Sequence, residues 1–244
     1  MEENKFSFPT EIVELPSKGL FYPETSPLSS GKVEMKYMTA KEEDILTNQA
    51  YIKKGIVLEK LLESLIVTKE INVKDLIVGD KNALFVAARV LGYGKDYTFY
   101  YDDQEYTVDL SKIENKSFDE SKLEKGKNEF LFTLPYLNAE ITYKLLTGHD
   151  DVNIEKEIEG LKKINKDSSS ELSTRLKYLI TSINGNKEPK DIRQFVDNYL
   201  LARDSRALRE HIKENQPDVN LNFTLDSGEE VAIPININFF WPDA

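Results

Sequence analysis

The sequence of 244 residues contains no cysteine. Disulfide bonds, thiolate metal sites and thiol nucleophiles are therefore excluded. The chain also has no apolar run of about 18 residues, so we expect no transmembrane helix. The segment from Met1 to Lys5 lacks the basic start and the apolar stretch of a secretory signal. These absences predict a protein that is made and kept in the cytosol.

Basic residues are outnumbered, with 32 Lys and Arg against 43 Asp and Glu, and the net charge is −11. Nucleic acids and anionic membranes are bound through clustered Lys and Arg, so we expect neither as a partner. The apolar share of 40% is too high for a disordered chain. The charge and composition together predict a folded protein whose partner is another protein.

Signatures of catalysis are scarce. The two histidines, His149 and His211, do not have a helical metal-binding spacing, and His149-Asp150-Asp151 reads as a loop and helix start. Gly92-Tyr93-Gly94 lacks the third glycine of a dinucleotide-binding loop, and neither a phosphate-binding loop nor a G-x-S-x-G elbow occurs. We therefore expect no enzyme, no cofactor and no metal.

Hydrophobic periodicity divides the chain into helical and β parts and predicts the α+β class. Two helical blocks are expected to flank a discontinuous antiparallel β module, with the N-terminal arm packed across it. The expected parts are an extended N-terminal arm (1–38), a helical block (39–92), a β segment (93–147), a second helical block (148–216), and a C-terminal β-hairpin with an aromatic tail packing with the β segment (217–244).

The helical blocks carry start signals and apolar stripes. Thr39 and Glu42 form a predicted capping box, and Asp80 is placed to cap a helix that stops at Gly92. In the second block, one stripe runs over 172–183 and another continues from Ile192 to Ile212.

The β parts show turn signals between apolar runs. Asp102-Asp103 predicts a hairpin within 97–110, and 130–134 and 141–145 read as two further strands. Alternating apolar residues on both sides of 226–228 predict the C-terminal hairpin.

Three groups of residues are candidates for partner binding. The turn Pro16-Ser17-Lys18-Gly19 is followed at once by Leu20, Phe21 and Tyr22. The large side chains of these three residues must be buried somewhere. The side chains of Phe239, Phe240 and Trp241 either pack in the chain's own core or are buried in a partner protein. Arg203, Arg206 and Arg209 share one helix face, which either docks an acidic surface or forms internal salt bridges.

Six segments, in order along nearly the whole chain, resemble the baseplate hub and hub-assembly family of T-even-type contractile-tailed bacteriophages. They are LPSKGLFYP (15–23), YMTAKEEDIL (37–46), GDKNA (79–83) followed by Arg89 and Gly92 to Gly94, LLTGHD (145–150), DSRALR (204–209), and Ile233-Pro234 leading to FFWP (239–242).

The resemblance implies a role in forming or assembling the hub beneath the tail tube, with hub, tail-tube or tape-measure proteins as partners. The protein would act in the host cytoplasm during assembly, and its presence in the finished baseplate is left open. The alternatives are a chaperone for the tape-measure protein and a peptidoglycan-directed hub enzyme.

The resemblance also implies a zinc-ribbon-like β module, because relatives carry Cys-x-x-Cys knuckles in both β parts. The corresponding places here, 100–103 and 224–227, contain no cysteine. The two β parts are therefore expected to lie side by side and to be held by apolar packing instead of metal.

Overall fold

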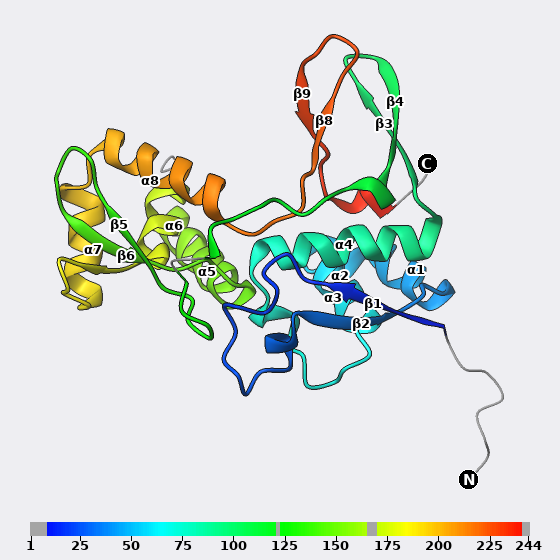
Figure 1. Cartoon of the computed structure of the whole chain (residues 1–244), viewed down its shortest axis with the longest axis horizontal. Coiled ribbons are helices and arrows are strands. Elements are labelled where there is room, and N and C mark those ends of the chain that lie inside the picture. The colour runs from blue at the N-terminus through cyan, green and yellow to red at the C-terminus, as the bar shows by residue number, and fades with distance from the viewer. Residues whose placement is uncertain (1–8, 121–122, 165–169, 241–244) are drawn as a thin grey trace.

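The computed structural model describes residues 9–120, 123–164 and 170–240. It combines helices with small antiparallel sheets, so the predicted α+β class is confirmed. Two bodies lie side by side, and two β-hairpins rise above one of them (Figure 1). None of the described helices is long and apolar enough to cross a membrane.

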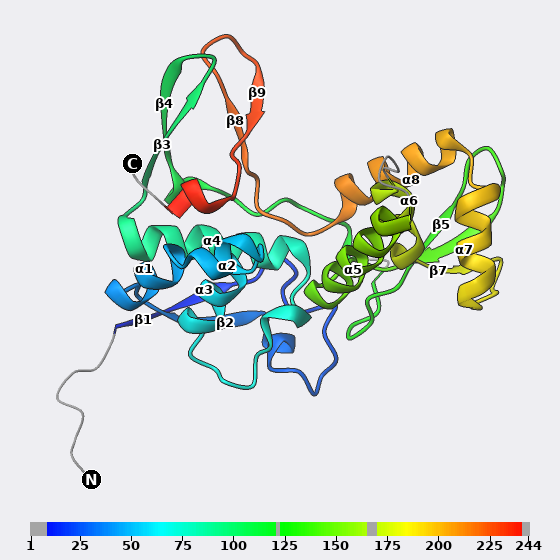
Figure 2. The same cartoon turned by 180° about the vertical axis from the view of Figure 1, so that it is seen from behind.

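The N-terminal body is built around helix α4 (Figures 1 and 2). An antiparallel hairpin of β1 and β2 lies along α4, and three shorter helices cover the side seen in Figure 2. The elements are β1 (Thr10–Glu14), β2 (Lys32–Lys36), α1 (Ala40–Leu46), α2 (Gln49–Lys53), α3 (Val57–Leu65) and α4 (Val78–Tyr93), with 3₁₀ turns at Pro27–Ser30 and Val73–Asp75.

The predicted signals in this body are largely confirmed. Thr39 and Glu42 form the capping box of α1. Leu61, Leu62 and Leu65 of α3 are fully buried, as expected from their spacing along one helix face. Most of the 1–38 arm, in contrast, packs on the helical body, and only its turn reaches the expected β segment, where Phe21 lies against Phe130. Its strands form the β1–β2 hairpin, because Val33 and Met35 bury their side chains within the helical body.

The second body combines a three-stranded sheet, in the order β5-β6-β7, with four helices. The elements are β5 (Phe130–Thr133), β6 (Glu140–Tyr143), α5 (Gly148–Ile164), α6 (Glu171–Leu179), β7 (Ile180–Ile183), α7 (Pro189–Asn198) and α8 (Ala202–Asn215). The expected single β segment over 93–147 is therefore wrong, since β5 and β6 pair with β7 of the second helical block.

Two helix predictions in the second body need correction. The stripe over 172–183 is helical only as far as Leu179. The segment from Ile180 to Ile183, in which Ile180, Thr181 and Ile183 are β-branched, pairs with β6. The helix expected to run unbroken from Ile192 to Ile212 is interrupted between α7 and α8. In both places the spacing of the apolar residues is compatible with a helix. Strand pairing or packing in the folded chain gives a different structure.

The remaining strands form two hairpins that stand side by side (Figures 1 and 2). They are β3 (Asp96–Tyr101) with β4 (Gln104–Asp109), and β8 (Asn222–Thr224) with β9 (Glu230–Ala232); 3₁₀ turns follow at Leu110–Lys112 and Ile237–Phe240. Asp102 and Asp103 form the predicted turn, both with positive φ. The ring of Phe223 packs edge-on against Phe99, with 5.4 Å between centroids.

Phe239 and Phe240 close the base of the hairpins against α4. Both side chains are 0% exposed. The Phe239 ring lies 4.9 Å from that of Tyr97, and the Phe240 ring lies 6.1 Å from that of Phe85 on α4. The C-terminal part of the described chain is therefore a wedge between hairpins and helix.

We expect Phe239→Ala to lower the free energy of unfolding by about 3–5 kcal/mol, because it leaves a cavity in a fully packed site. Leu172→Ala, at a half-exposed helical position, should change it by no more than about 0.5 kcal/mol. Urea unfolding measures the free energy of unfolding of both variants. An equal loss for the two would contradict the role of Phe239 as a packed wedge.

Candidate functional site

The N-terminus of α4 is held by a buried carboxylate. Asp80 accepts hydrogen bonds from the Ser17 backbone N–H at 2.9 Å and from the Ser17 hydroxyl at 2.6 Å. The Tyr22 hydroxyl donates to the same carboxylate at 2.6 Å and accepts from the Ile77 N–H at 3.1 Å. The LPSKGLFYP turn is therefore bound to a helix some sixty residues further along the chain.

The turn adopts the backbone conformation that its glycine predicts. Lys18 and Gly19 both have positive φ, at 53° and 76°. A Cβ on Gly19 would lie 2.5 Å from the carbonyl oxygen of Ser29, so no larger residue fits without a backbone shift. The constraint brings Ser17 and Tyr22 to the same side of the turn, facing Asp80.

Protonation of this network is set mainly by burial. Desolvation raises the pKa of Asp80 despite the hydrogen bonds from Ser17 and Tyr22, which act in the opposite direction. Burial, and then the nearby Asp80 charge, also raises the pKa of Tyr22. Tyr22 therefore remains a neutral hydrogen-bond donor at physiological pH.

Three distant segments meet at this helix end. Asn82 donates through Nδ2 to the Asp218 carboxylate at 3.1 Å. Gly79 lies so close to the 217–218 backbone that an added Cβ would fall 1.9 Å from the Pro217 carbonyl oxygen. Phe21 extends toward the second body, where its ring lies 5.4 Å from that of Phe130 on β5. We call this meeting point the α4 junction.

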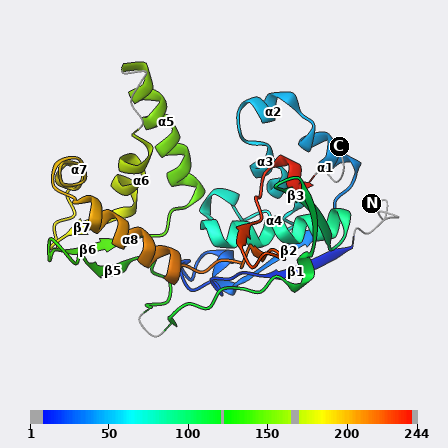
Figure 3. The ribbon, with the colours of Figure 1, turned by 90° about the horizontal axis from the view of Figure 1, so that it is seen from above.

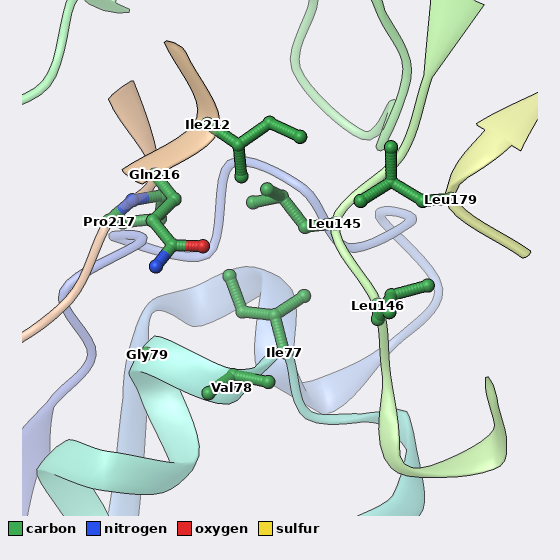
Figure 4. Close-up of a pocket in the computed structure, with 9 residues that line it drawn as sticks. All are labelled: Ile77, Val78, Gly79, Leu145, Leu146, Leu179, Ile212, Gln216 and Pro217. Atoms are coloured by element: carbon green, nitrogen blue, oxygen red, sulfur yellow. The ribbon is translucent and has the colours of Figure 1, made fainter. Parts of the chain in front are cut away.

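A small apolar cavity of about 120 Å³ lies where the two bodies meet at the α4 junction. Gln216 carries the one polar side chain among its lining residues, and its amide is seen at the edge of the cavity in Figure 4. The residues that line it are Ile77, Val78, Gly79, Leu145, Leu146, Leu179, Ile212, Gln216 and Pro217. Their chemistry suits apolar packing between bodies and offers no acid–base pair.

The same device recurs at other helix starts. Glu42 is the third residue of α1 and is fully buried. It accepts from the Thr39 N–H at 2.9 Å, the Thr39 hydroxyl at 2.6 Å, the Lys36 ammonium at 2.8 Å and the Ser64 hydroxyl at 2.6 Å. A carboxylate at this position also interacts favourably with the positive end of the helix.

Asp150 and Asp204 occupy the corresponding third positions of α5 and α8. Asp150 accepts from the Lys144 ammonium at 2.6 Å and from the Thr147 N–H at 3.0 Å. Asp204 accepts from the backbone N–H groups of Tyr136 and Leu137, at 2.9 and 3.1 Å. With Asp80 and Glu42, these residues form a set that we call the N3 carboxylates.

Each N3 carboxylate lies in one of the six segments that carry the family resemblance. The sequence-based interpretation missed their shared role, and it placed Asp80 as the cap of a helix that instead starts at Val78. The signal available in the sequence was an acidic residue at the third position of each helix. The partners could not be found in this way, because several lie more than sixty residues away.

Four of the proposed partner-binding side chains are buried in the chain itself. Phe21, Tyr22, Phe239 and Phe240 are at most 4% exposed. For Phe239 and Phe240 this burial agrees with the core alternative, and Phe21 and Tyr22 are likewise packed internally instead of forming an exposed partner-binding surface. Leu20 is half-buried, and Trp241 lies outside the described residues.

The three arginines of α8 are exposed on its outer face. Arg206 donates to Glu210 at 2.7 Å, which is an internal ion pair of the kind considered as the alternative. Arg203 lies over the ring of Tyr136, 5.4 Å from its centroid, and Arg209 donates to the Ser205 carbonyl at 3.3 Å. We call Arg203, Arg206, Arg209 and Tyr136 the α8 face.

The histidines have separate neighbours. His149 pairs with Asp75 at 2.9 Å, and the His211 ring lies 4.6 Å from that of Phe132. Within the described residues, no group of three His, Cys, Asp or Glu side chains is arranged to hold a metal ion.

Comparison with known proteins adds no family: no protein-family model, no curated protein and no solved structure matches the chain.

Tyr22→Phe should lower the free energy of unfolding by about 1–3 kcal/mol, because it removes a buried donor to Asp80 and leaves the Ile77 N–H without its acceptor. Tyr37→Phe is the matched control, since the Tyr37 hydroxyl contacts Glu11 at the surface. Denaturant unfolding measures the free energy of unfolding of the two variants. A loss for Tyr37→Phe as large as that for Tyr22→Phe would contradict the role of Tyr22 at the α4 junction.

Acidification should destabilise the fold through Glu42. Burial alone would raise the pKa of Glu42, but the hydrogen bonds from Lys36, Ser64 and Thr39 outweigh it and lower the pKa to about 2. Its stabilisation is therefore complete above the ordinary value of 4.5 and is lost as pH falls toward 2.

Between pH 5 and 2 the wild type should lose stability more steeply than Glu42→Gln, by up to roughly 3 kcal/mol. Thermal unfolding followed across this range measures the difference. Parallel pH profiles for the two proteins would show that Glu42 does not carry this dependence.

Proposed function

We propose that the protein is a component or assembly factor of the baseplate hub of a contractile-tailed bacteriophage and acts by binding other tail proteins without catalysis. The observation that carries the proposal is the ordered set of six resembling segments. Four of these contribute an N3 carboxylate that ties a helix start to a neighbouring or distant segment. Buried residues of this kind hold the helices in fixed positions. A fixed shape is expected of a protein that acts by binding other proteins.

The α8 face is the proposed docking surface. It combines arginines with an exposed tyrosine, the residue types that contribute most to protein interfaces. Tyr136 is 58% exposed although Arg203 lies over its ring. The three guanidinium groups of the face suit an acidic partner surface.

We further propose that the hairpin pair corresponds to the zinc-ribbon-like module of relatives. The two turns that would carry cysteines lie close together, since Tyr101 donates to Glu229 at 3.0 Å. The rings of Phe99, Tyr106 and Phe223 pack between the hairpins. Aromatic packing would then supply the cohesion that a metal supplies elsewhere.

Two alternatives lead to different observations. A tape-measure chaperone would co-purify with that long helical protein and would be missing from finished particles. A peptidoglycan-directed enzyme would release fragments from purified cell walls, and its activity would depend on acids converging in a polar cleft.

Mass spectrometry of purified virions, beside a pull-down from infected cells, tests the proposal. A hub subunit should appear in particles at a fixed small copy number, and an assembly factor should appear only in the pull-down, with hub proteins. Retrieval of the tape-measure protein alone would favour the chaperone, and retrieval of no tail protein would overturn the proposal.

The double variant Arg203→Glu, Arg209→Glu should reduce recovery of tail proteins about tenfold or more by reversing charge on the α8 face. Lys53→Glu, at an exposed position of α2, is the matched charge-reversal control and should leave recovery unchanged. Equal recovery with all three proteins would remove the α8 face from the proposal.

A further inference from the structure

The start of helix α8 lies beside the turn between β5 and β6 (Figures 1 and 2). Asp204 fixes the two to each other, because its carboxylate accepts from the backbone N–H groups of Tyr136 and Leu137 at 2.9 and 3.1 Å. The guanidinium of Arg203 lies over the Tyr136 ring, 5.4 Å from its centroid. The turn is therefore bound to the first turn of α8 by two separate contacts.

Large apolar side chains stay exposed at this place. Tyr136 is 58% exposed, Leu137 is 36% exposed, and Leu201, which directly precedes α8, is 45% exposed. The nearby Leu134 and Leu200 pack in the core, so the chain buries apolar residues around these three and leaves the three outside. Exposed apolar side chains beside charged ones are typical of a protein–protein contact. We call Tyr136, Leu137 and Leu201 the apolar patch.

The apolar patch lies at the end of the second body that points away from the N-terminal body. Figures 1 and 3 show α8 starting at this end and running back toward α4. Arg203 and Arg209 are six residues apart on α8, so they are separated by about 9 Å along the helix axis. The exposed surface therefore has two parts in a fixed order, with the apolar patch at the helix start and the guanidinium groups along the turns that follow.

The positive charge of this helix is largely available to a partner. Among the described residues, Arg203 and Arg209 form no ion pair, since one lies on an aromatic ring and the other donates to a backbone carbonyl. Arg206 pairs with Glu210, but the two side chains are 75% and 57% exposed. An ion pair this exposed contributes little to the free energy of unfolding, so a partner carboxylate can replace Glu210 readily.

We propose that the α8 face binds a segment of another protein in which large apolar side chains lie next to a run of Asp or Glu. The apolar side chains cover the apolar patch, and the carboxylates pair with Arg203 and Arg209. Guanidinium groups bind carboxylates through two parallel hydrogen bonds, which suits this assignment. The inference rests on the proposed role of the α8 face and adds the chemistry of what that face binds.

Preorganisation supports this assignment. Arg203 and Tyr136 already hold each other in place, so they lose little conformational freedom when a partner arrives. A nucleic acid would also pair with the arginines and stack on Tyr136. Its sugar–phosphate backbone is polar, however, and would leave Leu137 and Leu201 uncovered. The two leucines therefore favour a protein partner.

The probe is a fluorescein-labelled peptide in which leucine, phenylalanine and leucine are followed by three glycine–glutamate repeats. It is titrated into the full chain and followed by fluorescence anisotropy. One control peptide has three serines in place of the apolar residues, and the other has lysine in place of glutamate. The repeats span about 20 Å when extended, enough to reach both unpaired arginines. We expect the probe to bind at least about tenfold more tightly than either control.

Variants of the chain test each part of the surface. Leu201→Ser removes an apolar side chain, and Leu172→Ser is its matched control, because Leu172 is 47% exposed on α6. Serine is favoured at the N-cap position that Leu201 occupies, so α8 should still form. We expect Leu201→Ser to weaken binding of the probe about tenfold and Leu172→Ser to leave it unchanged. Arg203→Glu with Arg209→Glu should reverse the preference between the glutamate and lysine peptides.

The pull-down from infected cells separates this inference from the proposed function. Lower recovery of tail proteins with Leu201→Ser and with the double arginine variant supports both. Lower recovery with the arginine variant alone would overturn the two-part partner and leave the α8 face as a docking surface. Unchanged recovery with both variants would remove the face as well.

Three results in the binding assay would also overturn the inference. One is equal binding of the probe and its serine control. Another is tighter binding of a labelled oligonucleotide of ten thymidines than of the probe, which would assign the face to nucleic acid. The third is a dimer in light scattering that the double arginine variant makes monomeric, which would assign the face to a second copy of the chain.

Discussion

The hydrogen bonding of the buried Asp80 carboxylate is the interaction on which the rest of the structure depends. A carboxylate without donors in this position would be strongly unfavourable, so α4 can bury its first turn only when Ser17 and Tyr22 are present. The same helix end receives Gly79 against Pro217 and Asn82 against Asp218. Both ends of the described chain are thereby fixed to one helix.

Repetition of this device helps to hold together a fold that has no cysteine for a disulfide. Glu42 and Asp150 accept from the backbone N–H directly before their own helices, and Asp204 connects the start of α8 to the distant Tyr136 and Leu137. The hairpins, which could have been held by cysteines, are held by Phe99, Phe223 and the wedge of Phe239. Cohesion is distributed over many apolar and hydrogen-bonded contacts, and each remains specific because its polar partners are buried.

The N3 carboxylates, which lie in four of the resembling segments, are buried and face inward. The exposed features are different ones, such as the α8 face, with Arg203 over Tyr136.

The sequence by itself determined the α+β class, the Thr39–Glu42 capping box, the Asp102-Asp103 turn and the C-terminal hairpin, because propensity and periodicity are local properties. Only the tertiary structure decided that Ile180–Ile183 is a strand and that Phe21 and Phe239 are core. Those outcomes depend on which distant segment supplies a hydrogen-bonding partner or an apolar surface. Spacing along the chain does not contain that information, since the competing states have the same local pattern and differ only in long-range contacts.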